Sequence, residues 1–185
     1  MAADTVKSAS ITALDAAAPS LNAPLTEGYG ASGRVNDHSD FASLTAGGLV
    51  STASLYKMVR LPTSCILKLA RLFTKAGLDS STGLAVSLGA YYSDSVNDGT
   101  PAALQNTLIS ANCFMTAKAF GQSGAGSEVD ALSNLDANLR TVQLWQQVGL
   151  ASDPGGYIDI VLSVQAIATG VATAGNVALT VEVVN

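Results

Sequence analysis

The stretch YIDIVLSVQ, residues 157–165, decides the fold, because apolar and polar side chains alternate along it with a period of two. That period places successive side chains on opposite faces of a β-strand and predicts a strand with one buried face. The apolar positions are expected to face the core: Ile158, Ile160, Leu162 and Val164. The stretch NVALTVEVV, residues 176–184, repeats the pattern with Val177, Leu179, Val181 and Val183.

Four further stretches carry strand patterns, and turn signals separate them. They are LYKMVRL (55–61), CILKLARLF (65–73), GLAVSLGAY (83–91) and TVQLWQQV (141–148). In the second, Cys65, Leu67 and Leu69 are expected on one face, and Arg71 then breaks the alternation, which predicts a bulge or an edge. Turn chemistry at 97–99, 153–156 and 174–176 supports strands joined by turns. The sequence thus predicts an all-β sandwich or barrel and disfavours a parallel α/β fold.

One or two short helices are also expected. Thr100 followed by Pro101 favours a helix start, with apolar residues at helical spacing up to Ala111. Ser127 and Asp130 have the spacing of a capping box, which would begin a second short helix. The segment 108–120 is equally compatible with a strand.

Residues 1–48 differ from the rest, because they are rich in Ala, Ser, Gly, Asn and Pro. We interpret them as an extended N-terminal arm, with a strand where it docks, on a sandwich domain of residues 49–185. The alternative is a disordered tail.

Composition narrows the classes of function. The formal net charge is −5 and the pI about 4.6, so the chain lacks the cationic footprint of a nucleic-acid binder. Only 12% of the residues are charged and 48% are apolar, which favours a surface packed against other protein. No apolar run approaches the ~18 residues of a membrane span, and the N-terminus has no signal-peptide pattern. Cys65 and Cys113 lie in apolar runs, so a reducing compartment is expected.

No motif supports catalysis, a metal or a cofactor. The string Gly28-x-Gly30-x-x-Gly33 lacks the preceding strand and following helix of a dinucleotide site. Ser123 lies in an incomplete nucleophile elbow, and His38 is the single histidine. The cysteines and His38 lack metal-ligand spacing. We therefore expect no enzyme and no catalytic, cofactor-binding or metal-binding residues.

A few residues are candidates for contact with another protein. Five basic residues fall between positions 57 and 75, either as a solvated strand face or as a patch for an acidic partner. Aromatic residues could anchor an interface, although they could equally belong to the core. The candidate interface residues are Tyr29, Phe41, Lys57, Arg60, Lys68, Arg71 and Trp145.

Two stretches carry a resemblance to a known family. LWQQVGLASDPGGYIDIVLSV (144–164), with the final VALTVEVV, and KMVRLPTSCILKLARLFTKAGLDSSTGLAVSLG (57–89) resemble tailed-bacteriophage head decoration (cement) proteins. The resemblance implies a jelly-roll or related sandwich on the capsid exterior of the virion, assembled in the host cytoplasm. It implies the major capsid protein and further copies of itself, as a dimer or trimer, as partners. A tail, adaptor or fibre-base module and a carbohydrate-binding sandwich are the alternatives.

Overall fold

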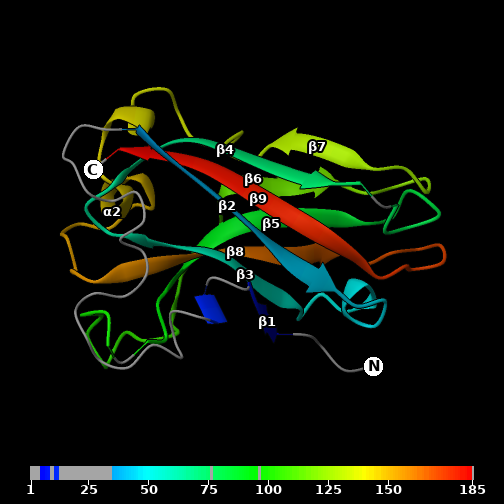
Figure 1. The fold of residues 1–185 in the computed structure, drawn as a ribbon, viewed down its shortest axis with the longest axis horizontal. Helices are drawn as coiled ribbons and strands as arrows, with labels where there is room; N and C mark the ends of the chain where they lie inside the picture. Colours follow the sequence, from blue (N-terminus) through cyan, green and yellow to red (C-terminus); the bar gives the residue numbers. More distant parts are fainter. Residues whose placement is uncertain (1–4, 9–10, 13–34, 76, 96, 185) are drawn as a thin grey trace.

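The computed structural model describes residues 5–8, 11–12, 35–75, 77–95 and 97–184. These residues form two β-sheets that pack face to face (Figure 1). Sheet A contains, in spatial order, β1 (Thr5–Lys7), β3 (Leu55–Pro62), β8 (Tyr157–Ala166), β5 (Ala85–Tyr92) and β6 (Leu108–Ala119). Sheet B contains β2 (Val35–Leu44), β9 (Gly175–Val184), β4 (Ile66–Thr74) and β7 (Ser127–Asp130). Short helical turns are η2 (Gly48–Val50), η3 (Leu139–Thr141) and α2 (Leu144–Gln147).

The strands β2 to β9 form a jelly roll. Their antiparallel pairs are nested in the sequence: β2 pairs with β9, β3 with β8, β4 with β7, and β5 with β6. This nesting is that of one long antiparallel hairpin rolled into a barrel-like shape. The additional pairs β4–β9 and β5–β8 then connect its strands into two sheets. The expected all-β jelly-roll-like sandwich is confirmed. Strand β1 is an addition to this topology, because it pairs in parallel with the outer edge of β3.

The core lies between the sheets, where the predicted alternation places apolar side chains. All the apolar positions predicted for 157–165, 176–184 and 83–91 are buried: Ile158, Ile160, Leu162, Val164, Val177, Leu179, Val181, Val183, Leu84, Val86, Leu88 and Ala90. Each large aliphatic side chain buried in this way contributes about 1.5–3 kcal/mol relative to an exposed one. Hydrophobic burial across the two sheets therefore explains why these sequences form strands.

Strand β4 contains the expected irregularity, but three positions before Arg71, the residue that signalled it. The register with β9 shifts between Leu67 and Leu69, which is a bulge centred on Lys68. After the bulge, Ala70 and Leu72 face the core, and Leu69 lies on the outer face with Arg71. The prediction that Leu69 shares the core face of Leu67 is therefore wrong.

The prediction of a strand at residues 141–148 is also wrong, because the middle of this stretch forms the short helix α2. Gln143 begins this helix with a capping box, in which its backbone N–H and the Gln146 side chain interact. The Leu144 N–H donates to the Cys65 carbonyl, which fastens the helix to the end of the sandwich. Leu144 and Val148 are both buried, four residues apart, so their spacing suits a helical turn as well as a strand.

Neither predicted helix in the middle of the chain forms. Residues after Thr100 make turns, and Leu108–Ala119 is β6, in agreement with the alternative strand interpretation. Ser127–Asp130 is β7, which pairs with Arg71–Thr74 of β4. Pairing with an exposed sheet edge supplies backbone hydrogen bonds that a short isolated helix could not outweigh.

The described parts of residues 1–48 belong to the sandwich. Strand β2 pairs with β9 over ten positions, and Ala42 and Leu44 contribute to the core. The sandwich therefore extends to the N-terminal side of the expected boundary at residue 49. Tyr29 and the glycine string 28–33 lie outside the described residues. Over the described part of the chain, no helix is long and apolar enough to cross a membrane.

Candidate functional site

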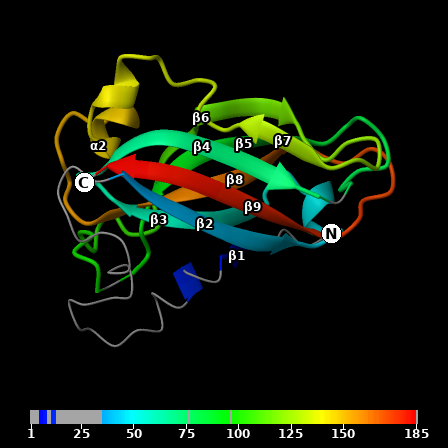
Figure 2. The same cartoon turned by 45° about the horizontal axis from the view of Figure 1, so that its top comes forward.

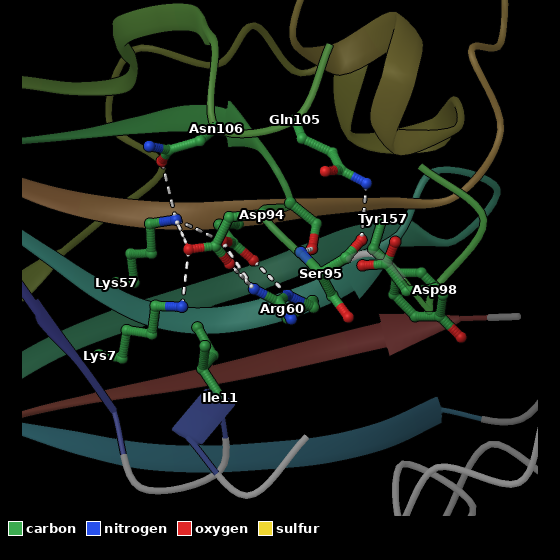
Figure 3. A network of polar contacts seen from close by, with 12 residues as sticks. Lys7, Ile11, Lys57, Arg60, Asp94, Ser95, Asp98, Gln105, Asn106 and Tyr157 are labelled. Carbon is green, nitrogen blue, oxygen red and sulfur yellow. Dashed lines mark hydrogen bonds and ion pairs between the residues drawn. The ribbon is translucent and has the colours of Figure 1, made fainter. Parts of the chain in front are cut away.

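The outer face of sheet A holds a network of buried ion pairs (Figure 3). Arg60 on β3 lies opposite Asp159 on β8 and donates two hydrogen bonds to its carboxylate, Nε to Oδ1 at 2.6 Å and Nη2 to Oδ2 at 3.1 Å. Both side chains are buried: Asp159 is fully inaccessible to solvent, and 2% of the Arg60 side chain is exposed. Such a bidentate pair fixes the geometry of both groups as well as their charges.

Asp94 and Lys57 extend the network toward the N-terminal segment. The Asp94 carboxylate receives Arg60 Nη2 at 2.7 Å, Lys57 Nζ at 2.9 Å and Lys7 Nζ at 2.6 Å. Lys57 also lies 3.2 Å from Asp159 and donates to the Asn106 side chain at 3.0 Å. The network thus joins β1, β3 and β8 to the loop between β5 and β6.

The two carboxylates titrate differently because their surroundings differ. Burial raises the pKa of Asp94, but the ammonium groups of Lys7 and Lys57 outweigh this and hold the pKa well below its usual range. Burial raises the pKa of Asp159 above its ordinary value, and the charges of Arg60 and Lys57 oppose that rise. Asp94 therefore remains ionised in mild acid, whereas the charge of Asp159 depends on its cationic partners.

The loop of residues 93–107 covers this part of sheet A. The Ser93 N–H donates to the Tyr157 carbonyl, and Thr100 exchanges hydrogen bonds with the backbone of Tyr157. On β5, Gly89 lies directly under the backbone of Ala111, where an added Cβ would approach within 2.4 Å. Asp159, Arg60 and Lys57 are therefore buried, while the partly exposed Asp94 and Lys7 fasten loop 93–107 and β1 to this part of the sheet.

This geometry corrects the predicted basic patch. Lys57 and Arg60 are buried in the sheet A network, whereas Lys68 and Arg71 lie on β4 in the other sheet. Lys68 donates to the Arg140 carbonyl, and the exposed Arg71 pairs with Glu128 at 2.7 Å. The clustering in sequence failed as a signal because β3 and β4 are consecutive strands on opposite sheets.

The outer face of sheet B carries several exposed apolar side chains, and Figure 2 shows its four strands lying side by side in front of sheet A. Phe41, Ala178 and Phe73 form one row across β2, β9 and β4, because Ala178 pairs with both phenylalanines. Phe41 is 48% exposed and Phe73 49%, and Val35 on the same face is 61% exposed. We call this the sheet B outer face, which consists of Val35, Asp37, Ser39, Phe41, Ser43, Ile66, Leu69, Arg71, Phe73, Glu128, Asp130, Asn176, Ala178, Thr180, Glu182 and Val184.

This face combines apolar and acidic side chains. Asp37 and Glu182 lie opposite each other, whereas the β7 carboxylates have cationic partners, Arg71 for Glu128 and the neighbouring Arg140 for Asp130 at 3.5 Å. Like charges on neighbouring strands are unfavourable unless something compensates them. The face is therefore suited to a partner that offers apolar side chains and positive charge.

Trp145 lies away from this face, on α2 at one end of the sandwich (Figure 1). Its indole N–H donates to the Gln143 side chain at 2.8 Å, and the residue is half-buried. Of the six candidate interface residues that the structure describes, Phe41 and Arg71 are thus the two that lie on one exposed face. Contact of either residue, or of Trp145, with another protein stays a prediction.

The candidate reactive residues are dispersed. Ser123 lies in a turn and its N–H donates to the Ser81 carbonyl, whereas His38 is on β2 beside Val181 of β9. Burial lowers the pKa of His38, and the neighbouring Asp37 opposes that shift. Cys65 and Cys113 are free thiols, and burial raises the pKa of each to about 12. Among the described residues, no group of three or more His, Cys, Asp or Glu side chains could hold a metal ion.

Sequence reasoning missed a second buried carboxylate, Asp79. It accepts hydrogen bonds from backbone N–H groups in two loops: Ser81, Gly83, Leu84, Thr169 and Gly170. Burial raises the pKa of Asp79, but these donors outweigh it and lower the pKa overall. The signal in the sequence was an acid followed by Ser-Ser-Thr-Gly, which is typical of a side chain that caps its own loop. The hydrogen-bond donors Thr169 and Gly170 could not be predicted, because they lie about ninety residues away in the sequence.

Comparison with solved structures supports the fold. A chain from the capsid of Ralstonia phage GP4 matches with a TM-score of 0.56 and 13% identity, covering 84% of this chain and 87% of that chain. A chain from the capsid asymmetric unit of cyanophage Pam1 matches with a TM-score of 0.49 and 15% identity, covering 86% of this chain and 90% of that chain. No protein-family model matches the sequence, and no curated protein matches it significantly. At this identity, the likeness to the GP4 capsid chain shows a shared fold.

Proposed function

We propose that this protein is a non-enzymatic virion structural protein that binds the outer surface of a phage capsid and cements neighbouring major capsid subunits. One observation carries the proposal: the jelly roll matches a chain of the GP4 phage capsid over most of both chains. Because similar shares are covered, the two chains are also similar in length. In this role the protein acts by binding alone, as a self-associated oligomer, without a cofactor.

The asymmetry of the sandwich supports one face as the proposed binding face. Loop 93–107 covers part of the outer face of sheet A, β1 extends the edge of that sheet, and both are held by ion pairs made within the chain. The sheet B outer face instead presents Phe41 and Phe73 half-exposed beside an excess of carboxylates over cations. Aromatic side chains in the centre of a patch, surrounded by polar groups, are typical of binding hot spots. The proposed contact on the capsid is therefore apolar with a positively charged rim.

The test is binding of the purified protein to expanded heads that lack it. Wild-type protein should bind saturably, and the double variant Phe41→Ser/Phe73→Ser should bind at least about 30-fold more weakly, since a hot-spot side chain contributes about 2 kcal/mol or more. Leu108→Ser is the matched control, because Leu108 is similarly exposed at 52% but lies on β6. Its affinity should equal that of the wild type.

Two results would contradict the proposal. One is the absence of saturable binding to the heads, with no gain in their resistance to heat or chelators. The other is equal binding by the wild type and the Phe41→Ser/Phe73→Ser variant, which would remove the sheet B outer face from the interface. A stabilising ligand must favour the bound shell by mass action, so binding and head stability should rise together with protein concentration.

A further inference from the structure

Strand β1 is not needed to complete the fold. The nested pairs from β2–β9 to β5–β6 close the jelly roll, and β1 only lengthens sheet A beyond β3. It pairs with β3 in parallel over three positions, Thr5 to Lys7, whereas the other described pairs in both sheets are antiparallel. A ladder this short, on an edge, is a modest contribution to stability.

Two further contacts anchor the segment of residues 5–12 at its described positions, and one of its side chains is fully buried. The Ser8 N–H donates to the Lys57 carbonyl at 2.7 Å, which continues the ladder by one bond. Lys7 reaches the Asp94 carboxylate at 2.6 Å, and Ile11 is completely buried (Figure 3). Backbone pairing supplies affinity here, while the cation and the aliphatic side chain four residues later supply specificity.

The receiving side is organised by the body of the protein. Lys57 and Arg60 on β3 form ion pairs with Asp94. With Asp159, these residues make a set of two cations and two anions. Lys7 adds a cation to a set that is already balanced. The edge of β3 and the position of Asp94 should therefore persist when the segment of residues 5–12 leaves.

The segment is joined to β2 through residues 13–34, a length of twenty-two residues. At about 3.3–3.6 Å per residue, twenty-two residues of any chain span at most roughly 70–80 Å. A second copy placed within that distance offers the same slot with the same contacts. Exchange between copies then replaces each contact by an identical one, and the high local concentration in an assembly favours it.

We propose that the outer edge of β3 with Asp94 is a strand-addition slot, and that in the self-associated protein it receives residues 5–12 of a second copy. The slot selects a strand with a cation at the position of Lys7 and an aliphatic residue at the position of Ile11. This inference rests on the self-association part of the proposed function and names the contact that brings it about. It makes no use of the sheet B outer face, so the two can fail separately.

The experiment mixes two full-length variants, Thr5→Cys and Leu55→Cys, both in a Cys113→Ser background. Thr5 and Leu55 are paired across β1 and β3, and directly paired strand residues lie within disulfide range. One parent carries a small tag, so that a crosslinked heterodimer has a distinct mass. Mixing Thr5→Cys with Ser43→Cys, an exposed position on β2, measures random collisions. Thr5→Cys/Leu55→Cys in one chain tests the register itself.

The slot predicts that the Thr5→Cys and Leu55→Cys mixture forms heterodimer at least about five-fold above the Ser43→Cys control. Adding Lys7→Glu to the Thr5→Cys parent should reduce that yield to the control level, because the introduced carboxylate would meet the carboxylate of Asp94. A heterodimer yield no higher than the control, after incubation at concentrations where the wild type self-associates, would overturn the proposal. So would failure of the double-cysteine chain to form any disulfide.

Discussion

Removing Arg60 should destabilise the protein more than its size suggests, because it leaves a buried carboxylate behind. In Arg60→Met the side-chain volume is largely kept, but Asp159 loses its contacts at 2.6 and 3.1 Å and retains Lys57 at 3.2 Å. Breaking a buried pair in this way costs about 3–5 kcal/mol in the free energy of unfolding. For a chain of this length, that corresponds to a fall in Tm of about 6–20 °C.

Arg71→Met is the matched control, since it makes the same substitution in an exposed pair. Arg71 and Glu128 are both more than half exposed, so the loss should stay below about 1 kcal/mol. Urea unfolding followed by circular dichroism measures both variants. The double variant Arg60→Met/Asp159→Asn also removes the buried carboxylate charge that Arg60→Met leaves without its main partner. It should therefore recover most of the stability lost in Arg60→Met.

The pH dependence separates this effect from simple loss of packing. Without Arg60, burial should raise the pKa of Asp159 further, so its ionised form penalises folding above that raised pKa and the penalty fades as the pH falls through it. The deficit of Arg60→Met relative to wild type should therefore shrink as the pH falls toward the ordinary carboxyl pKa of about 4, whereas the cost of a cavity would not change with pH. A deficit equal to that of Arg71→Met, or one independent of pH, would refute the reasoning.

Three other predictions follow from single features. Asp79→Asn should lower the free energy of unfolding by at least about 3 kcal/mol at pH 7, since charged hydrogen bonds across two loops are lost. Because the pKa of Asp79 is lowered, the difference in stability between variant and wild type should narrow in acid-unfolding curves as the pH falls below about 4. Gly89→Val should cost more than about 2 kcal/mol by thermal melting, since its side chain would meet the Ala111 backbone, and an unchanged Tm would argue against that packing. Deletion of residues 1–12 should leave cooperative unfolding intact, whereas deletion of residues 1–44 removes β2, exposes the edge of β9 and should give insoluble protein; a soluble, folded product of the longer deletion would place β2 outside the fold.

The core could be predicted from the sequence because alternation is a local property. Each strand with a clean period of two, such as 157–165, shows the expected buried face. TVQLWQQV failed because its apolar residues at 144 and 148 satisfy both periods, and the capping box at Gln143 favours the helix. Ser127–Asp130 failed because tertiary pairing with β4 overrode a local helix signal.

The ion-pair network could not be predicted, because its members meet only through the topology. Asp159 occupies an outward position of an alternating strand, where a solvated side chain is the ordinary expectation. It is buried because loop 93–107 folds over it, and nothing in the local sequence of that loop reports where it lies. The same reason explains why four of the five basic residues close in sequence are divided between two sheets, with Lys75 just beyond the end of β4.

The central claim is that this jelly roll binds the outside of a phage head through the sheet B outer face. A reconstruction of particles carrying the protein tests it directly, at a resolution that separates the strands. The account predicts that β2, β9, β4 and β7 lie against the shell, above a junction between neighbouring capsid subunits, with loop 93–107 directed away. Density for this chain on the tail, inside the shell, or with sheet A against the capsid would contradict it.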